Sequence, residues 1–179
     1  KAYIKLSEIQ GVTTGSGDLG DHASARASLA KAVGLLEQLI AVNPSAVHDQ
    51  RLLADSYSNL SYLTPPAESA VYADRSFEIY RLLRGLNPDK EKAEYDYAGA
   101  LWDRANQVRA NGNAHAAIEH FNEAASIYES LYKSTGNSRY RRSASLSYKN
   151  VGSVYRVTGD LVAALSSYEK ALEYDRQIA

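Results

Sequence analysis

The side chains most often used in catalysis are present, but they are not spaced as an active site. The histidines are His22, His48, His115 and His120. The last two are five residues apart, which does not place both on one face of a helix, and no His-Glu-x-x-His sequence occurs. The chain has no cysteine, so thiolate metal ligands, disulfides and cysteine nucleophiles are excluded. We therefore expect no metal site and interpret the histidines as exposed or close to helix caps.

Carboxylates, serines and glycines also form no recognisable site. Asp55, Asp96 and Asp103 are candidates for acid–base chemistry, but this chemistry needs two converging carboxylates. We interpret them instead as charges on solvated helix faces and at helix starts. No Gly-x-Ser-x-Gly sequence is present. The glycine-rich stretch 15–20 follows no strand and precedes no Lys-Ser/Thr pair, which indicates a flexible loop rather than a phosphate-binding loop. We predict no catalytic residues and no cofactor, in a protein that is not an enzyme.

The net charge and the hydropathy of the chain exclude further classes of function. The 179 residues include 20 Lys and Arg against 21 Asp and Glu, a net charge of −1, which argues against nonspecific nucleic-acid binding. Hydrophobic residues make up 45% of the chain, an ordinary globular proportion. No apolar run approaches the ~20 residues of a membrane span, and no signal peptide is recognisable. We expect a cytoplasmic protein that binds a protein or peptide, not nucleic acid or a membrane.

The elements that would position any binding site are delimited by regularly spaced helix breakers. The Asn-Pro pairs at 43–44 and 87–88 are 44 residues apart, and the Gly-Asn and Gly-Asp pairs at 112–113 and 159–160 are 47 apart. In the Gly-Asn and Gly-Asp pairs, Gly accepts a positive φ just past one helix, and Asn or Asp caps the next helix. The interval of about 44–48 residues predicts a structural repeat.

Helix-forming residues fill the intervals between these breakers, and no strand-like alternation is present. We predict helices over 2–12, 21–42, 46–63, 66–86, 89–110, 113–134, 138–157 and 160–178. Ser45 and Asp89 stand where N-caps are needed. Short turns make neighbouring helices antiparallel, so we predict an all-α fold, an α-solenoid of about four helix pairs in a single domain. The expected units are approximately 1–44, 45–88, 89–136 and 137–179.

Tyrosine is the unusual component, with 14 residues beside 2 Phe and 1 Trp. Helical spacing places several of them on inward faces: Tyr3, Tyr57, Tyr80, Tyr128, Tyr148, Tyr155 and Tyr168. In the last hairpin Leu165 and Leu172 share this inward stripe, and the small Gly152 allows the two helices to approach closely. One hairpin cannot offset its own chain entropy, so we expect neighbouring hairpins to stack.

The last hairpin resembles a tetratricopeptide repeat. The residues that carry the resemblance are Tyr148-x2-Val151-Gly152-x2-Tyr155, then Gly159-Asp160, then Ala164-x3-Tyr168-x2-Ala171. The third unit is similar from Leu101 to Ala124, and the first two match less completely. The family's unit has 34 residues, whereas the units here are longer, mainly in their second helices. The resemblance implies a right-handed superhelix that acts as a protein–protein interaction scaffold.

A second resemblance concerns the first segment, which is similar to repeat regions C-terminal to bacterial serine/threonine kinases. It rests on Ala2-Tyr3-x2-Leu6-x2-Ile9-Gln10-Gly11 and on Leu19-Gly20-Asp21. The chain starts at Lys1 and ends without an obvious polar capping helix, so we expect a fragment of a larger bacterial protein. An alternative function is therefore a self-association module of a signalling protein such as a kinase, which would form a homo-oligomer through its open ends.

The tetratricopeptide resemblance implies that one side of each first helix lines a concave groove. On that side lie Asn59, Tyr62, Trp102, Asn106, Arg109, Lys149, Asn150, Ser153 and Arg156. In the family, an asparagine at the position of Asn59 and Asn150 often clamps an extended peptide. Trp102 is the expected anchor, with helix packing as the alternative.

Basic residues of the groove side could attract an acidic segment, and a solvated surface is the alternative for all its polar residues. The run Arg139, Arg141 and Arg142 is interpreted as a solvated face rather than a binding patch. We predict a non-catalytic scaffold that binds a peptide or a partner helix in this groove.

Overall fold

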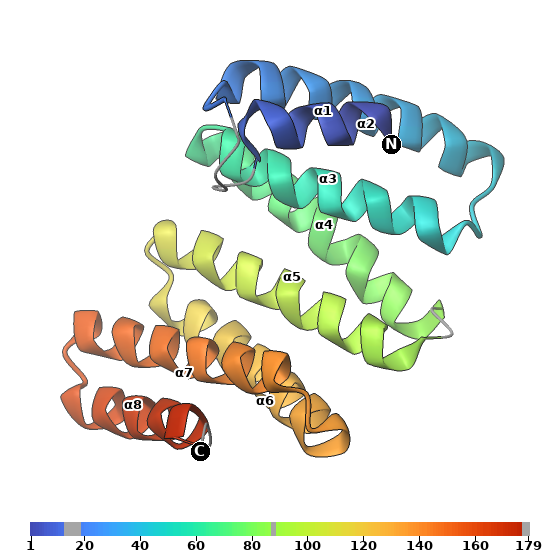
Figure 1. Cartoon of the computed structure of the whole chain (residues 1–179). Coiled ribbons are helices and arrows are strands. Elements are labelled where there is room, and N and C mark those ends of the chain that lie inside the picture. The colour runs from blue at the N-terminus through green and yellow to red at the C-terminus, as the bar shows by residue number, and fades with distance from the viewer. Residues whose placement is uncertain (13–18, 87–88, 177–179) are drawn as a thin grey trace. The chain divides into compact units, whose positions relative to one another are not determined.

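The computed structural model describes residues 1–12, 19–86 and 89–176, and all regular elements in these ranges are helical. The helices are α1 (Ala2–Ser7), a π-helical segment η1 (Glu8–Val12), α2 (His22–Val42), α3 (Val47–Leu63), α4 (Pro66–Leu86), α5 (Lys90–Ala110), α6 (Ala114–Thr135), α7 (Ser138–Thr158) and α8 (Leu161–Arg176). Figure 1 shows their order along the chain. The predicted all-α class is confirmed, and the helix boundaries lie within about two residues of the predicted ones except at the first helix.

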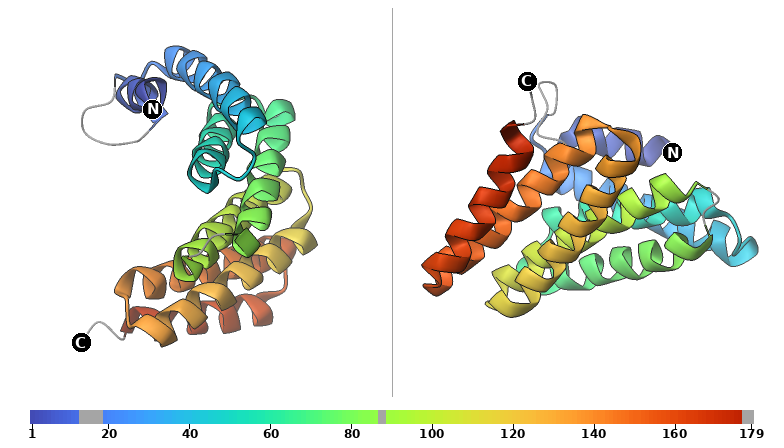
Figure 2. Two further views of the ribbon diagram at one scale, coloured as in Figure 1. Left: turned by 90° about the vertical axis from the view of Figure 1, so that its right-hand side faces the viewer. Right: turned by 90° about the horizontal axis from the view of Figure 1, so that it is seen from below.

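The chain divides into two compact units, Lys1–Asn87 with α1 to α4 and Pro88–Ala179 with α5 to α8. Within each unit, every helix packs against the next helix in the sequence. The paired helices run antiparallel, as Figures 1 and 2 show for α5 with α6 and for α7 with α8. Packing between sequence neighbours is the property that defines a helical solenoid, and it confirms the predicted fold class for each unit.

The breaker pairs work as the sequence predicts. Gly159 ends α7 in the left-handed region at φ 89°, and its N–H donates to the Tyr155 carbonyl. Asp160 then accepts a hydrogen bond from the Ala163 N–H at 3.0 Å. Asn113 accepts from the Ala116 N–H in the same way at the start of α6. Because one pair ends a helix and starts the next, the turn inside these hairpins is very short.

The predicted N-cap at Ser45 is wrong, and a further Gly-Asn turn, which the sequence analysis does not predict, joins α6 to α7. The N-cap of α3 is Ala46, which makes no side-chain cap bond, whereas the Ser45 hydroxyl donates to Asn43 Oδ1 at 2.9 Å. Between α6 and α7, Gly136 adopts φ 69° and Asn137 accepts from the Arg139 N–H. A Gly-Asn pair therefore also separates two hairpins, in the place that the Asn-Pro pairs hold at 43–44 and 87–88.

The first predicted helix is not one continuous α-helix. Gly11 has φ 133°, and a Cβ there would lie 3.3 Å from the Asp21 nitrogen, so only glycine fits this close approach. The ring nitrogen Nδ1 of His22 lies 3.0 Å from the Gly11 carbonyl oxygen, and the Leu19 N–H donates to the Ile9 carbonyl. These contacts hold the end of the first helix against the start of α2. Most of the predicted loop, residues 13–18, lies outside the described residues.

Each unit has its own apolar core. In Lys1–Asn87, Leu29 and Leu36 of α2 pack with Leu53, Tyr57 and Leu60 of α3. In Pro88–Ala179, a second cluster centres on Phe121, which is fully buried. Its other buried members are Ala105, Ala117, Val151 and Val154. These residues come from α5, α6 and α7, so the stacking of consecutive helices creates the core.

The inward stripe is largely as predicted, with three exceptions. Of the predicted tyrosines, Tyr57, Tyr80, Tyr128 and Tyr148 are buried, and Tyr155 and Tyr168 are half-buried. Tyr3 is 38% exposed, and Leu165 and Leu172 are 61% and 43% exposed, so their predicted core positions are wrong. The physical reason is that these side chains lie on faces of α1 and α8 that no other helix of the described residues covers.

Candidate functional site

Trp102 is anchored against the core at the middle of α5. Its ring meets the Phe121 ring edge-on, with 6.1 Å between the centroids. The indole is half-buried and packs with the cluster around Phe121. The helix-packing role is therefore present, and the part of the ring that is not covered faces solvent beside the polar residues that follow on α5.

A chain of hydrogen bonds runs from Trp102 along α5 and crosses to α7. Asn106 Nδ2 donates to the Trp102 carbonyl at 3.0 Å, and Arg109 Nη2 donates to Asn106 Oδ1 at 2.9 Å. Arg109 Nη1 reaches Asn150 Oδ1 on α7 at 3.5 Å. The Asn150 amide in turn donates to the Leu146 carbonyl at 2.9 Å. The structure thus brings four of the predicted residues, one of them Trp102, into one connected group.

A cavity of about 370 Å³ opens beside this group. Arg109 and Ser153, both predicted site residues, line it together with Val154 and Val157. The Arg109 guanidinium also lies over the Phe121 ring, 5.9 Å from its centroid, which fixes the charge at the edge of the cavity. The cavity therefore combines an apolar wall with one positioned cation and a hydroxyl.

A second cavity, of about 420 Å³, lies between α7 and α8. Arg141, Arg142 and Lys149 line it, together with Asp175 of α8. Lys149 Nζ is 2.7 Å from Asp175 Oδ2, and the Ser145 hydroxyl donates to Asp175 Oδ1 at 2.7 Å. These hydrogen bonds hold the pKa of Asp175 below its ordinary value, so the carboxylate stays ionised. Lys149 is therefore directed to α8 rather than to α5.

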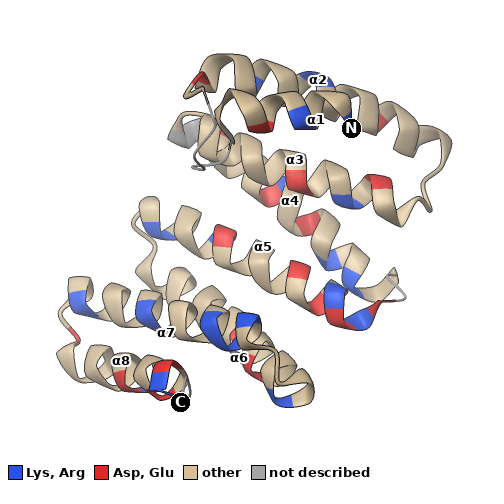
Figure 3. Cartoon of the chain, in the orientation of Figure 1, with Lys and Arg blue, Asp and Glu red and all other residues tan. Residues whose placement is uncertain are grey.

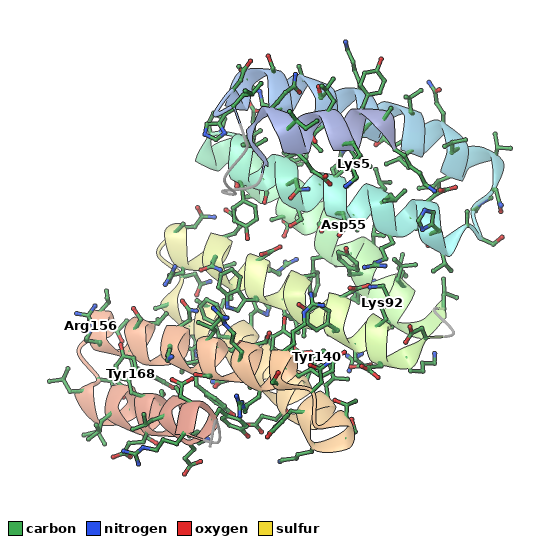
Figure 4. The ribbon with its side chains drawn as sticks, viewed as in Figure 1. Lys5, Asp55, Lys92, Tyr140, Arg156 and Tyr168 are labelled. Carbon is green, nitrogen blue, oxygen red and sulfur yellow. The ribbon has the colours of Figure 1, made fainter. Side chains whose placement is uncertain are left out.

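Helix α7 carries charge of one sign. Its 21 residues include Arg139, Arg141, Arg142, Lys149 and Arg156, and no Asp or Glu. Figure 3 shows these basic residues spread along α7, whereas α5 carries both signs. Arg156 is exposed near the C-terminal end of α7, and Tyr140 marks the opposite end in Figure 4. We call the residues Trp102, Asn106, Arg109, Arg142, Lys149, Asn150, Ser153 and Arg156 the α5–α7 surface.

Two predicted site residues belong to the other unit. Asn59 is half-buried and Tyr62 is 57% exposed on α3, within Lys1–Asn87. Arg142 was set aside in the sequence as part of a solvated run, yet it lines a cavity. The signal that could have identified it is the absence of any acidic residue over 138–158, which the overall balance of charge conceals.

The histidines and carboxylates considered for catalysis lie apart from this surface or have structural partners. His115 Nε2 is 3.3 Å from Glu119 on the exposed side of α6, and burial lowers the pKa of His120. Asp55 accepts a hydrogen bond from the Tyr80 hydroxyl. In the part of the chain that the structure describes, no three His, Asp or Glu side chains gather as a metal-binding group. No helix there is both long and apolar enough to cross a bilayer.

Comparison with known proteins identifies one part of the chain directly. A tetratricopeptide repeat model matches residues 147–178, the second half of α7 with α8. No curated protein matches the chain. A crystal structure of MamA is 20% identical with a TM-score of 0.41, covering 89% of this chain and 96% of that one. MamA MSR-1 C2 is 17% identical with a TM-score of 0.47, covering 99% and 98%.

A filament structure, DHF58, is 17% identical with a TM-score of 0.42, and the similarity covers 98% of this chain and 92% of that one. The family match spans the residues whose spacing carries the resemblance in the sequence, from Tyr148 to Ala171. The chain is thus a series of helical hairpins that contains a tetratricopeptide repeat at residues 147–178.

Proposed function

We propose that this protein is a non-catalytic scaffold whose α5–α7 surface binds an extended acidic segment of a partner protein. The observation that carries the proposal is the charge of α7, which has five basic residues and no acidic ones and contributes Arg142, Lys149 and Arg156 to this surface. Arginine suits this task because its planar guanidinium forms paired hydrogen bonds with a carboxylate. Tetratricopeptide repeats are interaction modules, which supports protein binding as the general role.

The contact between Asp175 and α7 within the molecule supports a preference for carboxylates. This carboxylate receives hydrogen bonds from Lys149 and Ser145 at the rim of the second cavity. Arg142 and Arg156 are exposed on the same helix and remain accessible to further carboxylates. The partly covered ring of Trp102 adds an apolar anchor, a residue type that often dominates binding free energy.

The test uses Trp102 as its own reporter, because it is the single tryptophan of the chain. A flexible Glu-rich peptide and a Lys-rich peptide of equal length are titrated while the Trp102 emission is followed. We expect the acidic peptide alone to change the emission, with an affinity that falls as salt is added because screening weakens exposed charge pairs. Arg142→Glu with Arg156→Glu should weaken binding at least about tenfold, which corresponds to ~1.4 kcal/mol.

The matched control is Lys133→Glu, which reverses an exposed cation on α6 outside the α5–α7 surface. It should leave the affinity close to that of the unchanged protein. Equal binding by the control and the double variant would contradict the proposed site, as would preference for the Lys-rich peptide. A helical circular dichroism spectrum shows that each variant remains folded.

We infer self-association as a second candidate function, supported by the exposed apolar side chains of α1 and α8. Both functions are compatible with a module of a larger signalling protein. The kinase context, and with it a bacterial cytoplasmic setting, stays a prediction from the resemblance of the first segment. The coding sequence on either side of this chain tests it, since a kinase domain upstream would support that context and an unrelated neighbour would contradict it.

A further inference from the structure

Helix α8 exposes an apolar stripe on the face away from α7. Leu161, Leu165 and Leu172 are 66%, 61% and 43% exposed. Their spacing of four and seven residues places them on one side of the helix. The sequence pattern predicts core positions for Leu165 and Leu172, and both are exposed.

The equivalent stripe of α6 shows what such a face binds. The hairpins repeat with an offset of 47 residues, so Ala114, Ile118 and Ala125 of α6 correspond to Leu161, Leu165 and Leu172 of α8. Ala114 and Ile118 pack with the cluster that contains Val151 and Val154 of α7, and Ala125 packs with Tyr148 of α7. In this repeat, the stripe on a second helix therefore holds the first helix of the next hairpin.

The residues that α7 uses in that contact recur on α1. With an offset of 145 residues, Tyr148, Val151 and Val154 correspond to Tyr3, Leu6 and Ile9. The alignment also pairs the buried Gly152 with the fully buried Ser7, so the small residue of each first helix occupies the same place.

These three residues of α1 and η1 are accessible, in contrast to their counterparts on α7. Tyr3, Leu6 and Ile9 are 38%, 42% and 56% exposed. Tyr3 also lines an apolar groove of about 380 Å³ whose other walls include Leu35, Leu39 and Val42 of α2, so the apolar area continues onto that helix.

We propose that α8 of one molecule packs against α1 of a second copy of this chain, in the register that joins α6 to α7 within one molecule. The inference rests on the proposed self-association and specifies its two faces. Charges support the pairing: Glu169 and Glu173 are exposed beside the α8 stripe, whereas the exposed Lys31 lies beside the α1 face, 5.7 Å from the Tyr3 ring centroid. The other lysine of this face, Lys5, pairs with Glu8 at 2.7 Å within its own molecule. The contact joins two different faces, so each added copy leaves one of each kind available.

The first experiment measures mass by light scattering and sedimentation of the complete chain over a wide range of protein concentration. The expected result is association that grows beyond a dimer as concentration rises. Leu165→Glu on α8 and Leu6→Glu on α1 should each weaken association at least about tenfold. Leu82→Glu, at a leucine 57% exposed on α4, is the control and should associate as the unchanged chain does.

The decisive experiment mixes the two variants. Leu165→Glu keeps an intact α1 face and Leu6→Glu keeps an intact α8 face, so an equimolar mixture should form a heterodimer that cannot grow further. A mixture that stays monomeric would overturn the pairing of α8 with α1. Oligomers that neither substitution affects would overturn it too while leaving self-association standing, and an unchanged chain that stays monomeric at all concentrations would overturn both.

Discussion

At the scale of single residues, the abundance of tyrosine over phenylalanine has a structural reason. Hydroxyl groups of buried tyrosines donate to carboxylates on neighbouring helices. Examples are Tyr57 with Glu37, Tyr80 with Asp55, Tyr97 with Glu123, Tyr140 with Glu91 and Tyr148 with Glu129. Each ring adds apolar volume to the core, while its hydroxyl reaches the edge of the core and donates a hydrogen bond to one particular carboxylate. These bonds fix the register of one helix on the next.

Tyr140→Phe should measure what one such bond contributes. The Tyr140 hydroxyl donates to Glu91 Oε1 at 2.5 Å and joins α7 to α5, as the position of Tyr140 beside the start of α5 in Figure 4 illustrates. Loss of a hydrogen bond to a charged group costs ~1.5–3 kcal/mol, and the exposed Glu91 places this one at the lower end. Urea denaturation of the unchanged chain and the variant measures this loss as a difference in the free energy of unfolding. Tyr155→Phe is the control, because the Tyr155 hydroxyl makes no hydrogen bond within the described residues, and equal losses in both would contradict the role of the bond.

We expect the stability difference between the unchanged chain and Tyr140→Phe to depend on pH. Burial, with the hydrogen bond to Glu91, raises the pKa of Tyr140 to about 12 from an ordinary value near 10. A raised pKa means that the folded state favours the protonated hydroxyl, so the contribution is complete below pH 10 and is lost as pH rises towards 12. The difference in free energy of unfolding between the unchanged chain and Tyr140→Phe should shrink over this range. A constant difference from pH 8 to pH 11.5 would contradict the shift.

At the scale of elements, close approach of two helices depends on one small residue. A Cβ added to Gly152 of α7 would lie 2.8 Å from Cε1 of the Tyr168 ring on α8. The predicted role of Gly152 is therefore confirmed by a contact with a tyrosine ring. The hairpin that matches the tetratricopeptide repeat model is the one built around this contact.

Gly152→Ala should destabilise the fold although alanine favours helix. Overpacking costs ~1–3 kcal/mol, and the better helix propensity offsets about 0.5–1 kcal/mol of this loss. Gly99→Ala on α5 is the control, because its Cβ would lie 3.8 Å from the Tyr128 hydroxyl, an ordinary contact distance. That variant should be neutral or slightly stabilised in thermal denaturation. In a double variant with Tyr168→Leu the Gly152→Ala penalty should largely disappear, and its persistence would show that the ring is not the cause.

At the scale of the whole molecule, two units with separate cores share one construction. Core residues of Pro88–Ala179 come from α5 to α8 only, as the clusters around Phe121 and Tyr148 show. In such a solenoid each hairpin packs only against its neighbours in the sequence, so the core is built from consecutive helices. The proposed binding site for an acidic segment lies entirely within this unit, whereas the proposed contact between copies uses one face from each unit.

Residues 89–179 should consequently fold without the rest of the chain. A core of its own is what allows a unit to fold independently. We expect a helical circular dichroism spectrum and a cooperative thermal transition, with a red shift of Trp102 emission when its contact with Phe121 is lost. A broad, non-cooperative transition would contradict the division into units.

The sequence by itself determined the helices, their order and most of their ends. Gly159 and Asp160 end one helix and begin the next through bonds within a few residues of each other, so the signal is local and readable. The repeat in these signals, with the resemblance it carries, also led to the confirmed solenoid class.

Only the tertiary structure decided which apolar and polar side chains are covered. Leu165 and Ile118 stand at equivalent positions, yet Leu165 is 61% exposed whereas Ile118 packs against the cluster that contains Val151 and Val154 of α7. Likewise, Asn150 was predicted to contact a partner, and its amide already accepts from Arg109 of a different helix. Periodicity identifies the face of a helix, but burial depends on a neighbour far away in the sequence. For that reason the cavities beside α7 and the exposed apolar faces of α1 and α8 became visible only when the helices were stacked.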